Sequence, residues 1–322
     1  MRRQRGRLRN GFVLVMVLTA IIVVGVAMTT TARKSLLASV AAIESQQAMQ
    51  RDWGMRSCQQ VLLNAGAQIF EISDRNVKSQ RGKRVTLPSI IEDRVILSGQ
   101  TFDLILADED AKAELNALYD AGGKRAVERA ISQVSGAFDA RTTRLMPVRP
   151  STQSIKRDED EDSSTETETG SGIETPVVEV TPAFRSWGEV FDLVQVHQLA
   201  GDDRQLAKMT RALSLQSSGR LNVFRASDDA VLAVCKAAVE DALAKRLLSK
   251  IRETSWNDIR LILEQTITNV KDRNVLQSLL GNSSNSFSLW IETTGKNVRQ
   301  QRFAVQAPSS MGVIKTSEFS FE

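Results

Sequence analysis

The sequence is poor in the residues on which catalysis, disulfide frameworks and metal sites usually depend. It has only two cysteines and one histidine in 322 residues, and no Walker loop, dinucleotide fingerprint, His-Glu-x-x-His, Gly-x-Ser-x-Gly or clustered Cys/His pattern. Cys58 and Cys235 lack metal-ligand spacing, so we expect two small buried residues, with a single disulfide as the alternative. His197 has no nucleophile or ligand set around it and is expected to be structural. The sequence therefore favours an interaction protein over an enzyme.

Proline is also scarce, and none precedes Pro88. Residues 32–71 are rich in Ala, Leu, Gln, Glu and Arg, which favour a helix. An apolar stripe with spacings of three and four runs along this segment through Met55, Cys58, Leu62, Ala65 and Ile69. We predict one long helix reaching about Phe70, on the order of 90 Å if unbroken, whose stripe packs on the protein's own sheet. The positions where it can bend are Gly25, Gly54 and Gly66.

Charge is missing from residues 11–32, and this run of 22 residues is almost entirely apolar. It is long enough to cross a hydrocarbon core of roughly 30 Å. Five arginines precede it, and positive charge resists translocation, so the N-terminus should stay cytoplasmic while the chain after Arg33 is exported. These arginines also account for the net charge of +4, so the exported part is close to neutral and its charge does not indicate nucleic acid.

The residues before the apolar run suggest a second property, a processing site. Gly11 and Phe12 stand in front of the run, whereas a secretory signal places small residues behind it. This layout resembles a type IV prepilin or pseudopilin leader, which a prepilin peptidase cuts after glycine before methylating the new N-terminal phenylalanine. The resemblance implies that Met16 occupies the position where major members of the family carry glutamate. Two alternatives stay open: an uncleaved signal anchor, and cleavage after Ala27 that releases a soluble protein.

Two alternating patterns predict antiparallel strands at opposite ends of the exported part. Residues 94–97 and 101–106 flank the turn dipeptide Ser98-Gly99 and predict a hairpin, preceded by a polar, basic loop over 73–92. Residues 287–292 and 303–305 flank a turn over 294–297 and predict a second hairpin. We expect the two hairpins to form one sheet against the long helix.

The stretch 108–118, which follows the first hairpin, begins with three consecutive acidic residues. It resembles the D-E-x-G-K-x-N-L-N-x-L segment of general secretion pathway protein K, the family of large minor pseudopilins of type II secretion. The matching residues are Asp108, Glu109, Lys112, Leu115, Asn116 and Leu118, whereas Ala111 and Glu114 depart from the pattern. By this resemblance the acidic residues can hold calcium, although as turn carboxylates we expect them to be solvated.

A second segment, residues 221–232, resembles the I-N-V-N-T-A-x-x-x-x-L signature of the same family. The matching residues are Asn222, Val223, Ala226 and Leu232. Ser227 is a good N-cap for a helix expected to run to about Leu248. Other helices are expected over 124–134, after Ser186, over 256–264 and over 271–280. Residues 195–201 stand where the family has a helix-hairpin-helix turn, but Asp202 and Asp203 would repel a phosphate, which argues against nucleic acid.

These patterns predict an α+β, pilin-like fold: a long N-terminal transmembrane helix packed on a small antiparallel sheet, with a large inserted α-helical domain. The expected divisions are a basic leader (1–11), the transmembrane and stem helix (12–71), the first part of the sheet (72–110), the first part of the helical domain (111–148), an acidic linker expected to be disordered (149–180), the helical domain (181–282) and the C-terminal strands that complete the sheet (283–322).

The resemblance implies a function and a location. The expected protein is a non-catalytic minor pseudopilin that caps a type II secretion pseudopilus, anchored once in the bacterial inner membrane with its C-terminal part in the periplasm. The implied partners are I-like and J-like minor pseudopilins, the major pseudopilin, prepilin peptidase and inner-membrane lipid, without nucleic acid. Two other functions stay open, a minor pilin of a type IV pilus and a single-pass envelope sensor.

Overall fold

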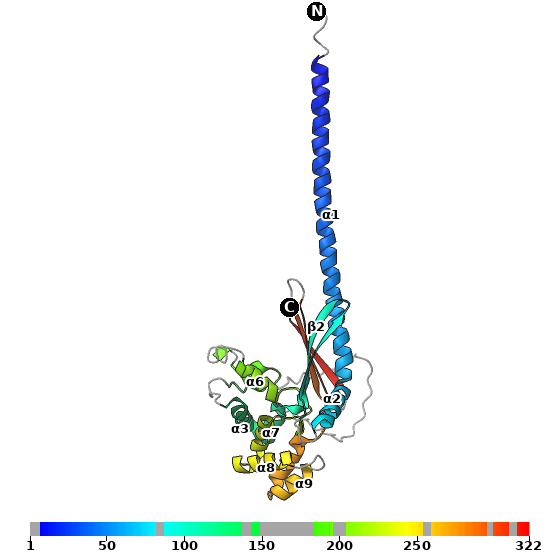
Figure 1. Cartoon of the computed structure of the whole chain (residues 1–322). Coiled ribbons are helices and arrows are strands. Elements are labelled where there is room, and N and C mark those ends of the chain that lie inside the picture. Colours follow the sequence, from blue (N-terminus) through cyan, green and yellow to red (C-terminus); the bar gives the residue numbers. More distant parts are fainter. Residues whose placement is uncertain are drawn as a thin grey trace, which may run out of the picture.

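The computed structural model describes residues 7–81, 87–136, 143–148, 183–192, 194–195, 204–253, 259–294, 299–308 and 314–321. The C-terminal part of a long helix packs against a five-stranded antiparallel sheet, and its N-terminal part projects away from the sheet (Figure 1). A group of shorter helices lies beside the end of the sheet remote from this projecting part. The predicted pilin-like α+β fold is confirmed. We call the sheet and the part of the long helix that packs on it the body, and residues 109–286 the head.

The long helix is formed by α1 (Arg7–Asn64) and α2 (Gly66–Arg81). Only Ala65 interrupts it, and the helical hydrogen bonds continue there, since Ala65 N donates to Val61 O (3.0 Å) and Ile69 N donates to Ala65 O (2.9 Å). The interruption lies beside Gly66, where a Cβ atom would come within 3.0 Å of the Phe287 ring. A single long helix was therefore predicted correctly.

The predicted loop over 73–92 is wrong at both ends, because α2 continues to Arg81 and the first strand already begins at Ile90. Contacts with the rest of the protein stabilise the helix beyond the C-terminal end of its apolar stripe. Phe70 is 1% exposed and stacks on Phe287 with ring centroids 5.7 Å apart, and one turn later Asp74 forms a buried ion pair. The polar composition of the segment did not reveal these two contacts.

The sheet has the order β1-β2-β7-β8-β9 and is antiparallel throughout. Its strands are β1 (Ile90–Leu97), β2 (Gln100–Asp108), β7 (Phe287–Thr294), β8 (Arg299–Pro308) and β9 (Ile314–Phe321). Both predicted hairpins are confirmed, as is their union in one sheet, since β2 pairs with β7. Ser98 (φ 50°) and Gly99 (φ 78°) form the first turn with the positive φ values that a tight hairpin requires. Strand β9 was not predicted.

The lower part of the long helix buries its stripe against this sheet. Met55 and Cys58, which were predicted to be core, are 5% and 6% exposed. They belong to a cluster with Leu63 and Phe70 of the helix and with Phe102, Leu104, Leu106, Leu289 and Ile291 of the sheet. Burial of this kind stabilises by roughly 25 cal/mol per Å² of apolar surface, and it holds the helix on the sheet.

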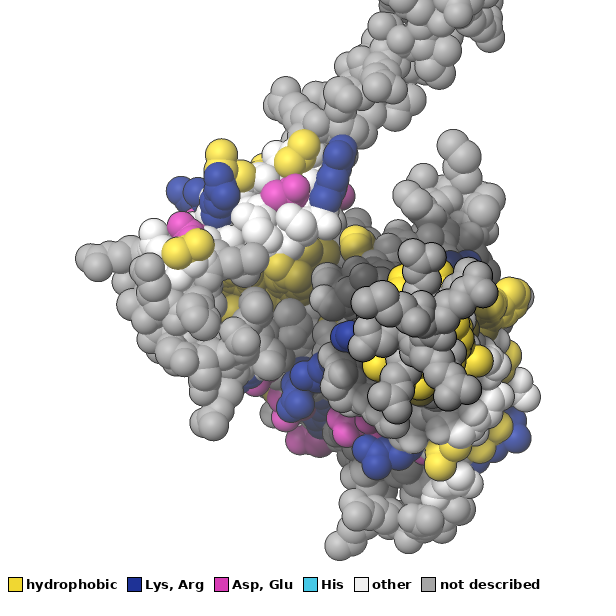
Figure 2. Space-filling model, turned by 90° about the horizontal axis from the view of Figure 1, so that it is seen from above, with side chains coloured by type: hydrophobic (Ala, Val, Ile, Leu, Met, Phe, Trp, Pro, Cys, Tyr) yellow, Lys and Arg dark blue, Asp and Glu magenta, His cyan; other side chains and the backbone are white. Residues whose placement is uncertain are grey.

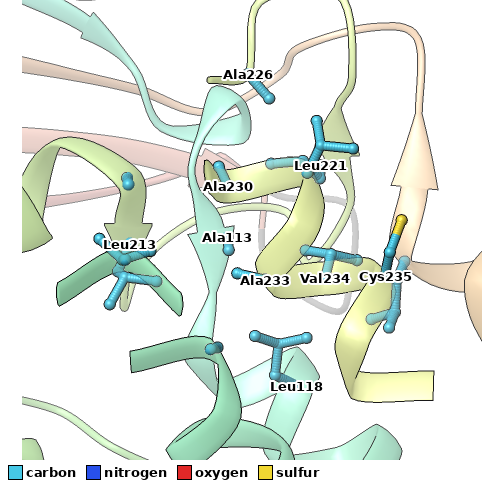
Figure 3. Packing of buried hydrophobic residues seen from close by; sticks show 14 of the residues in the cluster. Ala113, Leu118, Leu213, Leu221, Ala226, Ala230, Ala233, Val234 and Cys235 are labelled. Carbon is cyan, nitrogen blue, oxygen red and sulfur yellow. The ribbon is translucent and has the colours of Figure 1, made fainter. Parts of the chain in front are cut away.

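The head is inserted between β2 and β7, two strands that are neighbours in the sheet. Its helical elements are η1 (Glu109–Ala111), α3 (Leu115–Ser135), α4 (Trp187–Val190), α6 (Arg204–Ala212), α7 (Asp228–Ala238), α8 (Asp241–Glu253), α9 (Ile259–Thr266) and α10 (Val270–Leu279). Two short parallel pairs accompany them, β3 (Ala113–Glu114) with β4 (Leu213–Ser214), and β5 (Leu221–Asn222) with β6 (Leu280–Gly281). Small residues allow close packing here: Figure 3 shows Ala113 of β3 near Ala230 and Ala233 of α7.

Several predicted helix boundaries in the head are corrected. Helix α3 starts at Leu115 and is interrupted by non-helical dihedral angles at Gly123 (φ 65°), so its second part matches the helix predicted over 124–134 and its first part was not predicted. The helix expected to reach Leu248 ends at Ala238 before α8 begins. Ser227 caps α7 as predicted, accepting from Ala230 N (3.2 Å). Ser186 precedes α4 but makes no capping bond; Glu189 instead accepts from the backbone N–H of Arg185 (2.6 Å).

Both cysteines are buried as free thiols in different cores, Cys58 in the body and Cys235 in the head, so the single bridge is not formed. The acidic linker expected over 149–180, together with His197, Asp202 and Asp203, lies outside the described residues.

Candidate functional site

The N-terminal part of α1 exposes its apolar side chains instead of packing them. Phe12 is 64% exposed and Met16 60%, and none of the most apolar 18-residue window of this helix is buried. It is the one helix among the described residues that is long and apolar enough to cross a membrane. The backbone of Gly11 lies within α1.

The few hydroxyl groups in this segment are satisfied inside the helix. Thr19 Oγ1 donates to Val15 O (3.0 Å), Thr29 Oγ1 to Gly25 O (3.0 Å) and Thr31 Oγ1 to Ala27 O (2.8 Å). In a hydrocarbon environment every polar group needs an internal partner, because water is absent. The segment therefore meets the chemical requirement for a single-pass anchor.

The acidic run at the end of β2 lies at the junction of body and head, and it is not solvated. Asp108, Glu109 and Asp110 are 0%, 4% and 0% exposed, so the expectation of solvated turn carboxylates is wrong. Asp110 Oδ2 accepts from the N–H groups of Asn285 (2.7 Å) and Ser286 (3.1 Å), and its Oδ1 accepts from Ser218 N (2.8 Å). Backbone donors thus replace water around this carboxylate, which makes its burial tolerable.

Glu109 connects three elements through both of its carboxylate oxygens. Oε1 accepts from Lys112 Nζ (2.6 Å) and from Ser288 Oγ of β7 (2.5 Å), while Oε2 accepts from Ser214 Oγ of β4 (2.6 Å). Lys112 is itself largely buried, so this is an ion pair shielded from water. The matching Glu and Lys of the family segment therefore lie together in the structure.

Arg225 forms a second buried contact, between the head and both parts of the body. Its Nη2 lies 2.6 Å from Asp74 Oδ2 of α2, and its Nε lies 3.4 Å from Asp108 Oδ2 of β2. The guanidinium carbon lies 4.7 Å from the centre of the Phe70 ring, a cation–π contact. This arginine departs from the family signature, so sequence comparison gave no reason to select it.

Burial changes the protonation of two carboxyl groups near this junction. Desolvation raises the pKa of Asp108 to about 7, with Asp110 adding to the rise and the Ser284 hydroxyl and Arg225 opposing it. Desolvation also raises the pKa of Glu114 to about 7, against the hydrogen bond from Ala117 N. Both groups therefore change charge near neutral pH.

A serine that the sequence did not single out joins the two family-like segments. Ser284 Oγ donates to Asp108 Oδ2 (2.5 Å) and accepts from Asn222 Nδ2 (2.8 Å). Asn222 Oδ1 in turn accepts from Phe224 N (3.1 Å), which fixes the loop before α7. Asp108 and Asn222, 114 positions apart in the chain, are thus two hydrogen bonds apart in space.

The remaining predicted residues hold the head itself together. Asn116 donates from Nδ2 to Phe184 O (3.1 Å) and Leu215 O (3.2 Å) and accepts from Phe184 N (2.7 Å), so one amide ties three segments. The matching apolar residues Leu115, Leu118, Val223 and Ala226 are buried in the head core, and Leu232 is partly buried against it. Arg252, not predicted, donates to Val223 O (2.8 Å) and Ala226 O (2.7 Å).

The acidic run does not fit a calcium site. Its carboxylate oxygens already accept from backbone N–H groups and hydroxyls, and the positive charges of Lys112 and Arg225 lie against them, where a cation would be repelled. Within the described ranges, no group of three or more His, Cys, Asp or Glu side chains is arranged for a metal ion. The junction is built to join parts of the protein.

The described surface carries charges of both signs. Figure 2 shows Lys and Arg side chains interspersed with carboxylates and hydrophobic side chains. The same mixture lines a hollow of about 1090 Å³, where Arg125 and Arg129 lie beside Glu128 and Asp241. A hollow of mixed charge differs from the uniformly basic lining that binds nucleic-acid phosphates.

The fold and the junction define a pilin-like protein with a helical domain inserted in its sheet. Neither a protein-family model nor a curated protein matches this sequence. Among solved structures, a chain in the crystal structure of the GspK–GspI–GspJ complex from the enterotoxigenic Escherichia coli type 2 secretion system is similar. The TM-score is 0.46 with 16% identity, over 87% of this chain and 99% of that chain. A likeness of this degree does not transfer a function to this chain.

Proposed function

We propose that this protein is a non-catalytic minor pseudopilin that caps the tip of a type II secretion pseudopilus and supports export of folded proteins across the outer membrane. The observation that carries the proposal is the insertion of a helical head between the adjacent strands β2 and β7 of a pilin-like body. A head fixed by buried ion pairs adds bulk at the end of the stem remote from the anchor, where it would obstruct the stacking of another subunit (Figure 1).

Met16 supports a position of this subunit at the end of the filament. In the major members of the resembled family, glutamate occupies this place and pairs with the terminal amine of a neighbouring subunit within the lipid. An unpaired ammonium or carboxylate buried in lipid costs several kcal/mol, so each stacked subunit needs its counter-charge. This chain offers the amine of Phe12 to a subunit below it, but Met16 offers no carboxylate to one above it. Only the topmost subunit can omit that group without penalty.

The proposal includes processing, location and partners. Prepilin peptidase would cleave between Gly11 and Phe12, leaving α1 as a single-pass anchor in the bacterial inner membrane and the body and head in the periplasm. The partners would be I-like and J-like minor pseudopilins at the tip and the major pseudopilin below, in contact with inner-membrane lipid.

Site-specific cross-linking in a native host tests the tip position. Cysteines introduced on the exposed part of the stem, for example Met49→Cys, should give adducts with I-like and J-like subunits at one filament end and in few copies. A regular distribution along the filament would contradict the proposal, as would normal pseudopilus assembly in cells that lack the protein.

A further inference from the structure

Two basic residues, Arg33 and Lys34, interrupt the apolar surface of α1. Both side chains are exposed, and they carry the only charges between residues 10 and 43. On their N-terminal side the helix exposes the apolar run of the anchor, and on their C-terminal side it exposes further apolar residues such as Leu36 and Ile43, at 64% and 54%. The helix is continuous through this point. Two charges therefore divide one long apolar surface into two parts.

The spacing along the helix places this pair at the surface of a membrane. Arg33 lies 21 residues after Phe12, which is about 32 Å at about 1.5 Å per helical residue. The hydrocarbon core of a bilayer is about 30 Å thick. When Phe12 lies at one boundary of the core, Arg33 and Lys34 therefore lie at the opposite boundary, at the level of the lipid phosphates.

The protein itself does not neutralise the two cations. Within the described part of the chain, the side chains of Arg33 and Lys34 form no ion pair, whereas Arg56, further along the stem, lies 3.0 Å from the carboxylate of Asp52. The nearest carboxylate along the helix belongs to Glu44, about 15 Å beyond Lys34. Both charges are thus available to a group outside the chain.

The pair is complementary in charge and reach to lipid phosphates. Lys and Arg at a membrane boundary can lay their aliphatic part along the hydrocarbon and extend their charged end to the headgroups. Consecutive residues of a helix point about 100° apart, so the two side chains reach different lipid molecules. The hydroxyls of Thr30 and Thr31 donate to Ala27 O (2.9 Å and 2.8 Å), so they do not compete for the phosphates.

We propose that Arg33 and Lys34 bind the phosphate groups of anionic lipids in the outer leaflet of the inner membrane and thereby fix the depth of the anchor. The choice of leaflet follows from the export of the chain after Arg33, so this inference rests on the proposed function. Without the two charges, residues 11–43 would form one uncharged run of 33 residues, about 50 Å long. Such a run exceeds the thickness of the hydrocarbon core and would have no fixed position in it.

Photolabelling of the full-length protein in nanodiscs tests the site. The nanodiscs contain phosphatidylethanolamine and phosphatidylglycerol, either of which carries a photoreactive headgroup, and mass spectrometry maps the labelled residues. The phosphatidylglycerol analogue should label residues 33–40 about fivefold or more above the phosphatidylethanolamine analogue. Mapping separates this label from any label on the arginines of the leader. Equal labelling by the two analogues would overturn the proposal, as would no labelling of this segment.

Substitution of both residues tests whether the charges recognise the lipid. Arg33→Gln with Lys34→Gln should lower the phosphatidylglycerol label by about fivefold for each cation, the fold-change that corresponds to about 1 kcal/mol per basic residue near an anionic surface. Both positions are exposed and glutamine favours a helix, so the variant should keep α1 intact. An undiminished label would overturn the proposal.

Two controls are matched to this variant. Arg33→Lys with Lys34→Arg keeps both charges, and Arg56→Gln removes a charge remote from the membrane, so each should label as the wild type does. A loss of label in either control would show that the charge at the boundary is not what binds the lipid. A label that added inorganic phosphate abolishes would assign the pair to free phosphate and overturn the lipid assignment.

Cysteine reactivity tests the depth of the anchor. In a Leu36→Cys variant the new thiol lies within one turn of the boundary, on the exported side, and should react with a membrane-impermeant maleimide, whereas Cys58 and Cys235 are buried. When Arg33→Gln and Lys34→Gln are added, the helix should sink into the membrane and the reaction rate should fall severalfold. An unchanged rate would contradict a depth fixed by these charges.

The outcomes for this inference and for the proposed function are distinguishable. If the chain begins at Phe12 and caps a filament but the two lipid analogues label it equally, the lipid site is wrong and the function stands. If the anionic lipid labels the pair on a chain that keeps its leader in cells, the lipid site stands and the function is wrong.

Discussion

The long helix is joined to the sheet and the sheet to the head by two interfaces of different chemistry. The centre of the stem–sheet interface is apolar, with Met55, Cys58 and Phe70 packed on Phe102 and Leu289, and polar contacts such as Arg302 with Asp52 lie beside it, where α1 meets β8. The body–head junction, by contrast, contains buried charged groups. Arg225 contacts Asp108 and donates to Asp74 of α2, and Glu109 accepts from serine hydroxyls of β4 and β7.

The difference indicates what each interface is for. Apolar burial is non-directional, so it attaches the helix firmly but fixes its rotation only through shape. Buried ion pairs contribute little net stability, yet they are strongly unfavourable in any other geometry. The junction therefore fixes the orientation of the head relative to the stem, as a subunit that presents its head at a filament end would require.

The largest effect is expected from Arg225→Met at the junction. The variant leaves the carboxylates of Asp74 and Asp108 buried without their cation, and loss of one partner of a buried pair costs about 3–5 kcal/mol. The midpoint of unfolding should fall accordingly in denaturant titrations of the detergent-solubilised protein.

The matched control is Arg75→Met, which removes an ion pair to Glu71 whose side chains are 73% and 63% exposed. It should cost well under about 1 kcal/mol. Equal effects of the two variants would show that the buried ion pairs of the junction matter no more for stability than an exposed pair.

A smaller effect is expected at the stem–sheet interface from Gly54→Ala. The new Cβ would lie 2.3 Å from Cζ of Phe102, a ring that is fully buried and cannot move aside freely. Overpacking of this kind costs about 1–3 kcal/mol. Gly25→Ala in the membrane segment meets nothing within 4 Å and should leave the thermal midpoint unchanged. If both variants behave alike, the contact of α1 with β2 is looser than the packing indicates.

The last effect is a pH dependence that arises at the junction. Asp108 and Glu114 have pKa values raised to about 7, so the folded chain binds more protons than the unfolded chain between the ordinary carboxyl value of about 4 and about 7. The contribution of these two groups to the free energy of unfolding is therefore fully present below the ordinary carboxyl pKa. It is lost as the pH rises through about 7, by at most ~1.4 kcal/mol per pH unit for each group.

The double variant Asp108→Asn with Glu114→Gln should flatten the slope of unfolding free energy between pH 5 and pH 7.5, whereas the exposed Asp93→Asn should not. A slope that is unchanged in the double variant would assign the pH dependence to other groups. The Arg225→Met defect should also be milder at pH 5, because Asp108 is then protonated.

The sequence allowed the periodic and locally encoded features to be predicted. The long helix, both hairpins with their turn at Ser98-Gly99, and the N-cap at Ser227 all depend on patterns within a few residues. The union of the hairpins in one sheet was also predicted, and the pairing of β2 with β7 confirms it.

The junction could not be predicted, because its contacts join residues far apart in the chain. Consecutive acidic residues such as Asp108 and Glu109 are usually solvated, and only the fold brings Ser284 and Ser288 to them. Arg225 and Arg252 had no distinguishing pattern in sequence. Strand β9 was missed since its apolar residues are few and its pairing with β8 supplies the order.

The mature N-terminus, determined by mass spectrometry of the protein purified from its native membrane, is the decisive test of whether this protein is a pseudopilin. We expect a chain that begins at Phe12 with a methylated amine, and accumulation of precursor in a Gly11→Leu variant. A mature chain that begins at Met1 or at Met28 would contradict it.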